Sequence, residues 1–134
     1  MTRKSKFPLV SHGAALLAFL ILLFILIVPP RYLFSLTREL RAGAQKAQDL
    51  VLGHDVQAAV PVLDALCQRF SQAEETLKLF LNHEDVYALK ATLFSARNLA
   101  VMDEAGNLLT ELQTILQLTA QMDAAETLSI YNLF

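Results

Sequence analysis

The sequence is poor in the residues that build disulfide frameworks, loops and charged surfaces. It has one cysteine, Cys67, which excludes an intramolecular disulfide framework and a zinc site made of several thiolates. Four glycines and four prolines in 134 residues argue against a fibrous, low-complexity or loop-rich all-β protein. There is no tryptophan, and charged residues make up only 18%, whereas about 25% is typical of a soluble domain. Leucine and alanine dominate instead, which favours helices.

Sequence patterns of catalytic and cofactor sites are also missing. The chain contains no Gly-x-Ser-x-Gly, no glycine-rich phosphate loop and no Gly-x-Gly-x-x-Gly. His83 lacks the second histidine, one helical turn later, that the zinc-protease pattern requires, because Tyr87 stands there. We therefore expect no enzyme activity, no metal site and no cofactor. We interpret His83 and His54 as turn residues, and Asp123 and Glu126 as solvated helix residues.

Charge changes sign along the chain. Residues 1–46 carry a formal charge of +6, residues 47–97 carry −3, and residues 98–134 carry −5 with no basic residue at all. A protein that binds nucleic acid needs a basic face on its folded domain. The folded part here is acidic, so we expect no nucleic-acid partner.

A long apolar run follows the basic N-terminal tail of residues 1–6. Residues 7–30 contain no Asp, Glu, Lys or Arg. As a helix, residues 7–28 would be roughly 33 Å long at about 1.5 Å per residue, enough for a hydrocarbon core of about 30 Å. We therefore predict a transmembrane anchor over residues 7–30, with the lipid bilayer as its partner.

The rival interpretation of this run is a cleaved signal peptide. Small residues at a cleavage site are missing directly after it, and the first such pair, Ala42 and Ala44, lies far downstream. We therefore expect an uncleaved signal-anchor. The short basic tail favours an N-terminus in the cytoplasm and a C-terminal domain outside it, in a single-pass protein of the cell envelope.

Helical periodicity continues after the anchor. We expect Pro29 and Pro30 to end or kink the membrane helix. An amphipathic seam follows, and a more regular one comes after Gly53, a predicted C-terminal cap, and Asp55, a predicted N-cap. The first seam contains Leu33, Leu36, Leu40, Ala44, Ala47, Leu50 and Val51, and the second contains Val56, Ala59, Leu63, Leu66, Phe70, Ala73, Leu77 and Phe80.

Breaks between helices are expected at two further places. Residues 82–85 form a polar cluster that suits a turn, and residues 103–107 include a Gly-Asn pair typical of turns. We expect Pro61 to bend the second seam or delay its start. The predicted fold is all-α: one N-terminal transmembrane helix followed by a three- to four-helix antiparallel bundle over residues 31–128, and an apolar tail of residues 129–134.

An apolar stripe recurs every seven residues in the last third of the chain, and acidic residues border it. We predict that this stripe binds a partner. Its members are Tyr87, Phe94, Val101, Leu108, Ile115 and Met122. The unbroken sevenfold phase also leaves open one long helix in place of two.

The layout is similar to that of bacterial envelope proteins that place a helical bundle after one N-terminal anchor. It also resembles the first half of a chemoreceptor-type sensor, but no second apolar segment follows.

The leading hypothesis is a non-enzymatic accessory subunit or scaffold of a membrane complex, with other membrane proteins or a second copy of the chain as partners. The alternatives are an extracytoplasmic sensory or ligand-binding module, and a subunit holding a haem or pigment through His12. Cys67 is expected to be a buried, inert thiol.

Overall fold

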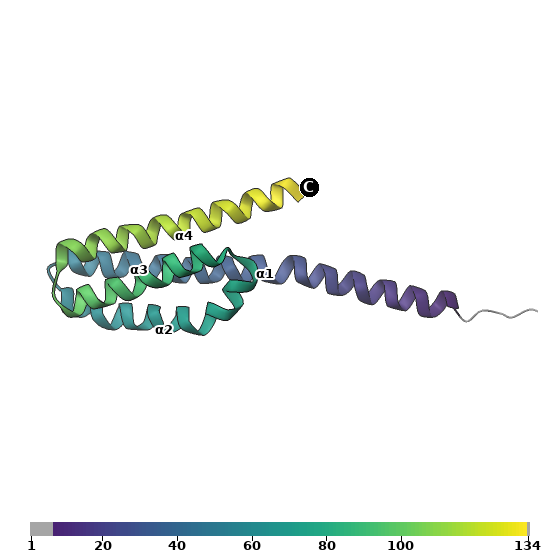
Figure 1. The fold of residues 1–134 in the computed structure, drawn as a ribbon, viewed down its shortest axis with the longest axis horizontal. Coiled ribbons are helices and arrows are strands. Elements are labelled where there is room, and N and C mark those ends of the chain that lie inside the picture. Colours follow the sequence, from purple (N-terminus) through teal and green to yellow (C-terminus); the bar gives the residue numbers. More distant parts are fainter. Residues whose placement is uncertain (1–6, 134) are drawn as a thin grey trace, which may run out of the picture. The chain divides into compact units, whose positions relative to one another are not determined.

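The computed structural model is built from α-helices. It describes the backbone of residues 7–133 and the side chains of residues 11–26 and 31–124. The helices are α1 (Phe7–Leu52), α2 (Val56–Phe80), α3 (His83–Val101) and α4 (Ala105–Leu133), as Figure 1 shows. No strand occurs among residues 7–133, so the all-α prediction is confirmed for this part of the chain. The chain divides into two compact units, Met1–Tyr32 and Leu33–Phe134.

The prolines do not delimit helices as expected. Helix α1 is assigned through Pro29 and Pro30, although the two residues remove two adjacent amide donors from its ladder. Helix α2 begins at Val56, so Pro61 lies inside it and does not delay its start. The predictions of a helix end at Pro29 and Pro30 and of a late start to the second seam are therefore wrong. The alternatives, a kink at Pro29 and Pro30 and a bend at Pro61, stay predictions. Both helices tolerate the missing donors because bonds on either side persist.

The second unit is a four-helix bundle made of residues 33–52 of α1 together with α2, α3 and α4 (Figure 1). The seam predicted on residues 33–51 is buried, with Leu50 half-buried at its edge. The seam predicted on α2 is buried from Val56 to Leu77, with Phe70 fully enclosed. Its last member, Phe80, is 46% exposed because it lies at the end of the helix. The core of the bundle thus forms where the predicted apolar faces of the helices pack together.

Ion pairs and close contacts fix which helices are neighbours. Arg69 Nε of α2 donates to Glu39 Oε2 of α1 at 2.8 Å, and Gly43 of α1 lies directly against Leu66 of α2. Helix α3 packs against both α2 and α4. Arg41 of α1 pairs with Asp123 of α4, which closes the ring. Short turns join helices that run in opposite directions, as in an up-down bundle.

The turn after α1 uses a residue other than the expected glycine. The left-handed conformation that a glycine cap usually supplies falls on His54, at φ 63°. The His54 N–H donates to the Val51 carbonyl at 3.0 Å, and the Asp55 N–H donates to the Leu50 carbonyl at 2.9 Å. This pair of bonds defines a Schellman motif. The cap predicted at Gly53 is therefore displaced by one residue.

The other two turns lie where the sequence predicts them. Asn82 caps α3, and its side chain accepts a hydrogen bond from the Glu84 N–H at 3.2 Å. After α3, a second Schellman motif places Asp103 at φ 60°. Gly106 lies inside the first turn of α4, so the Gly-Asn pair does not form the break. Residues 83–133 therefore form two helices.

Candidate interaction surfaces

The apolar segment of α1 is the most extensive exposed apolar surface among the described residues. Every side chain from residue 11 to residue 26 is exposed, and none of its most apolar 18-residue window is buried. Within the described residues, α1 is the one helix long and apolar enough to cross a membrane, by length and composition. Since apolar side chains left in water carry a free-energy cost, this surface calls for an apolar environment. The basic tail of residues 1–6 lies outside the described residues.

The structure divides the seven-residue stripe between two environments. Leu108 and Ile115 are fully buried in the bundle, and Met122 is nearly so. Tyr87 and Val101 of α3 are more than half exposed. The turn between α3 and α4 reverses the chain, so an unbroken phase in the sequence does not place the six side chains on one surface. Phe94, the third α3 member, is 37% exposed.

Helix α3 therefore carries an exposed apolar stripe, which we call the α3 stripe: Tyr87, Phe94 and Val101. Its core-facing side is separate and consists of Val86, Leu89, Leu93, Ala96 and Ala100. A spacing of seven residues places one side chain every two turns, the narrow seam by which a helix contacts a second helix. Lys78 of α2 lies over the Tyr87 ring, with Nζ 5.4 Å from its centroid, and steadies that end of the stripe.

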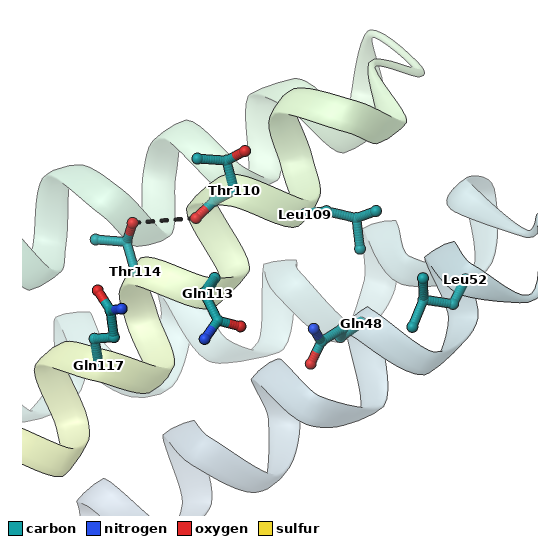
Figure 2. Close-up of a pocket in the computed structure, with 7 residues that line it drawn as sticks. All are labelled: Gln48, Leu52, Leu109, Thr110, Gln113, Thr114 and Gln117. Atoms are coloured by element: carbon teal, nitrogen blue, oxygen red, sulfur yellow. Dashed lines mark hydrogen bonds between the residues drawn. The ribbon is translucent and has the colours of Figure 1, made fainter.

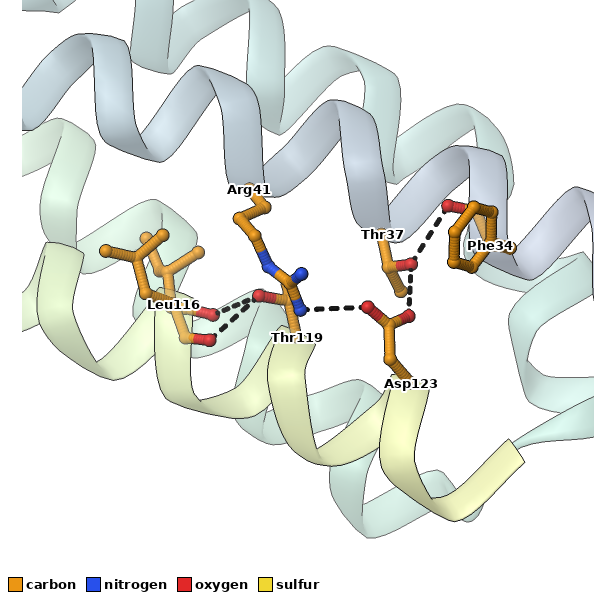
Figure 3. A network of polar contacts seen from close by, with 7 residues as sticks. Phe34, Thr37, Arg41, Leu116, Thr119 and Asp123 are labelled. Carbon is orange, nitrogen blue, oxygen red and sulfur yellow. Dashed lines mark hydrogen bonds and ion pairs between the residues drawn. The ribbon is translucent and has the colours of Figure 1, made fainter. Parts of the chain in front are cut away.

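Polar side chains between α1 and α4 form a cluster that the sequence interpretation missed (Figure 3). Arg41 Nη2 donates to Asp123 Oδ2 at 2.8 Å, and the Thr37 hydroxyl donates to Asp123 Oδ1 at 2.6 Å. Thr37 is buried, and Asp123 is about one-fifth exposed. The expectation that Asp123 is a solvated residue is therefore wrong. The available signal was the spacing of Thr37 and Arg41, which four residues apart share one face of a helix.

A second polar cluster joins α2 to α3. Lys90 Nζ of α3 donates to both carboxylate oxygens of Glu74 at 3.0 and 3.2 Å, and Lys78 Nζ lies 3.4 Å from Oε1 of the same residue. The hydrogen bond from Lys90, with the charge of both lysines, lowers the pKa of Glu74 below its usual value. Arg97 and Asp64 form a further ion pair between the same two helices.

The thiol and the three histidines differ in burial. Cys67 is buried as predicted, its thiol donates to the Leu93 carbonyl at 3.5 Å, and burial raises its pKa. His54 and His83 lie exposed at turns, and His12 is exposed on the apolar segment. In the part of the chain that the structure describes, no group of three or more His, Cys, Asp or Glu side chains is placed to hold a metal ion.

An open groove lies between the end of α1 and the start of α4 (Figure 2). Its lining is uncharged: Gln48, Leu52, Leu109, Thr110, Gln113, Thr114 and Gln117. Amide and hydroxyl groups can hydrogen-bond a polar molecule, but an open groove encloses little of a ligand's surface. Catalysis by proton transfer or nucleophilic attack is not supported by this lining.

Comparison with known proteins gives no relative from which a role could be transferred: no family model, curated protein or solved structure matches the chain.

Proposed function

We propose that this chain is a single-pass, membrane-anchored helical bundle that acts as a non-enzymatic subunit or scaffold of a membrane protein complex. The observation that carries the proposal is the uninterrupted exposure of the apolar segment, residues 11–26, in a chain whose bundle has a buried apolar core of its own. A bundle with such a core does not need that segment for stability. Lipid is the environment that would cover it.

The α3 stripe is the surface that we assign to protein partners. The other large exposed apolar side chains of the described bundle lie at its two ends: Phe34, Leu52, Leu79, Phe80 and Met102. The stripe runs along most of α3. An aromatic pair with a β-branched residue at heptad spacing fits a second helix, from another membrane protein or from a second copy of this chain. Catalytic and cofactor roles have no comparable support.

Membrane attachment and orientation are tested with a single-cysteine chain. Ser71 is exposed on α2, so we replace Cys67 with Ala and introduce Ser71→Cys. A membrane-impermeant maleimide should label this variant in intact spheroplasts, with the protein remaining in the membrane fraction after carbonate extraction. Labelling only after lysis would reverse the topology. Release of the full-length chain by carbonate would overturn the anchor.

The partner surface is tested by the double variant Tyr87→Ser and Val101→Ser. The size of the complex extracted in mild detergent, measured by native electrophoresis after cross-linking, should fall to that of the isolated chain. Because both side chains are more than half exposed, the bundle should retain its helicity and melting temperature. Leu52→Ser is the matched control, since Leu52 is 59% exposed but lies outside the stripe. Unchanged complex size in the double variant would contradict the assignment.

A further inference from the structure

Exposed large apolar side chains lie at both ends of the bundle. Leu52, Val101 and Met102 lie at one end, and the other end is the one that the chain joins to the apolar segment. Leu79 is 77% exposed and Phe80 is 46% exposed at the end of α2, and Phe34 is 48% exposed near the first residues of α1 that belong to the bundle. We call these three residues the apolar rim.

Helix register places the three residues at the same end. Glu39 pairs with Arg69, and the two helices run in opposite directions, so a step forward on α2 matches a step back on α1. Leu79 is ten residues after Arg69, and Phe34 is five residues before Glu39. At about 1.5 Å per residue, the two lie roughly 15 Å and roughly 8 Å from the ion pair in the same direction along the bundle. Leu52 and the turn at His54 lie at the opposite end.

The covalent chain ties this end to the apolar segment. Only residues 29–32 separate Val28, the last residue of the apolar run, from Leu33, the first residue of the bundle unit. Even fully extended, those five steps span no more than about 18 Å. If residues 7–28 cross a bilayer, the end of the bundle that carries the apolar rim is therefore the end tethered to that bilayer.

We propose that the apolar rim, Phe34, Leu79 and Phe80, inserts into the interfacial region of the bilayer that holds the anchor. This inference rests on the proposed membrane attachment. Aromatic and leucine side chains are favoured at that depth, and Arg38 lies over the Phe34 ring, with Cζ 4.8 Å from its centroid, where its charge can reach the headgroups. The exposed acids nearby, Glu75, Glu84 and Asp85, offset the positive charge of Arg38. Insertion therefore depends on apolar contact and needs no anionic lipid.

The absence of tryptophan from the chain gives a clean test. Three single-tryptophan versions of the full chain are reconstituted into phosphatidylcholine vesicles that contain lipids brominated near the headgroup end of the acyl chain. Leu79→Trp reports on the rim, Leu52→Trp on a leucine that is 59% exposed at the far end of the bundle, and Phe24→Trp on the anchor. Circular dichroism verifies that each variant keeps its helicity.

We expect tryptophan quenching in Leu79→Trp to be several-fold greater than in Leu52→Trp, and the emission of Leu79→Trp to be blue-shifted. Phe24→Trp should respond to bromines placed deeper in the acyl chains. Quenching in Phe24→Trp but not in Leu79→Trp would overturn the rim and leave the anchor standing. No quenching in Phe24→Trp would overturn the anchor itself. Equal quenching of Leu79→Trp and Leu52→Trp would show that the bundle contacts lipid without end preference, which also overturns the inference.

Discussion

Arg41 and Asp123, which are 82 positions apart in the chain, join the first and last helices of the bundle through a contact of 2.8 Å between Nη2 and Oδ2. The Thr37 hydroxyl contacts the other oxygen of the same carboxylate, so both oxygens of Asp123 are engaged by α1. No other described ion pair links α1 to α4. This cluster is therefore one specific contact in the register with which α4 packs against α1.

Removing either member of the Arg41–Asp123 pair should destabilise the bundle, and the two losses should not add. Because both side chains are partly exposed, a double-mutant cycle with Arg41→Ala and Asp123→Ala should give a coupling of about 0.5–1 kcal/mol. Thermal or chemical unfolding of the full chain in mild detergent, followed by circular dichroism, measures it. A coupling within error of zero would mean that the contact is not maintained in solution.

The close contact between Gly43 and Leu66 predicts that the effect of Gly43→Ala on stability depends on which residue stands at position 66. A Cβ atom on Gly43 would lie 2.9 Å from Cγ and Cδ1 of Leu66, a side chain that is itself buried. Overpacking of this kind costs about 1–3 kcal/mol, which exceeds the gain of about 1 kcal/mol from replacing glycine by alanine in a helix. Gly43→Ala should therefore destabilise the native chain. In a Leu66→Ala background the same change should stabilise it, and a loss in both backgrounds would contradict this account.

His54 holds a left-handed conformation that glycine adopts without steric strain. His54→Gly should therefore raise stability by about 0.5–1 kcal/mol, after allowing for the greater freedom of glycine in the unfolded chain. Gln57→Gly is the matched control, since Gln57 is exposed in the first turns of α2 and a glycine there should lower stability by about the same amount. Melting temperatures that fall in both variants would show that the turn is not strained.

The seams of α1 and α2 were predictable from sequence because each helix buries one face, and a period of three and four residues reports that face directly. Phe80 departs from its seam because a helix end has fewer neighbours than its middle. The pairing of Asp123 with Arg41 was not predictable, because the register between helices distant in the chain decides which acid meets which base. Thr37 and Arg41 share a face, but nothing in the sequence indicates what lies opposite.

The stripe of six residues at heptad spacing shows that periodicity in the sequence does not reveal where one helix ends and the next begins. Leu108 and Ile115 continue the phase of Tyr87 and Val101, yet the Schellman turn at Asp103 separates the two pairs into different helices with independent rotations. Periodicity describes a face only within one helix. The position of the turn was indicated by residues 103–107, but the residue that forms it was not, because Asp103 rather than Gly106 takes the left-handed conformation.

Burial of the α4 half of the stripe predicts a clear difference between substitutions that look alike in the sequence. Leu108→Ser or Ile115→Ser should each cost about 3–5 kcal/mol, because each leaves a cavity and a hydroxyl in the core. Such a loss rivals the whole stability of a small domain, so these variants should lose cooperative unfolding. Tyr87→Ser and Val101→Ser should each stay within about 1 kcal/mol. Equal losses in the two groups would place the α3 stripe in the core as well.

The ion pairs of Glu74 should make the stability of the bundle fall as the pH is lowered. Lys90 and Lys78 hold the pKa of Glu74 below its ordinary value of 4.5, so the folded state binds this proton less readily than the unfolded state does. The stabilisation is fully present above pH 4.5 and is lost as the pH falls from there through the folded pKa. Glu74→Gln should therefore lower stability at pH 7, by about 0.5–1 kcal/mol for a partly exposed pair, and have progressively less effect as the pH falls below 4.5.

Glu75→Gln is the matched control, because Glu75 is 88% exposed and contacts Lys78 alone at 3.4 Å. Its melting temperature should follow that of the native chain at each pH. If the difference between Glu74→Gln and the native chain stayed constant down to acidic pH, the stabilisation would not come from the ionised carboxylate.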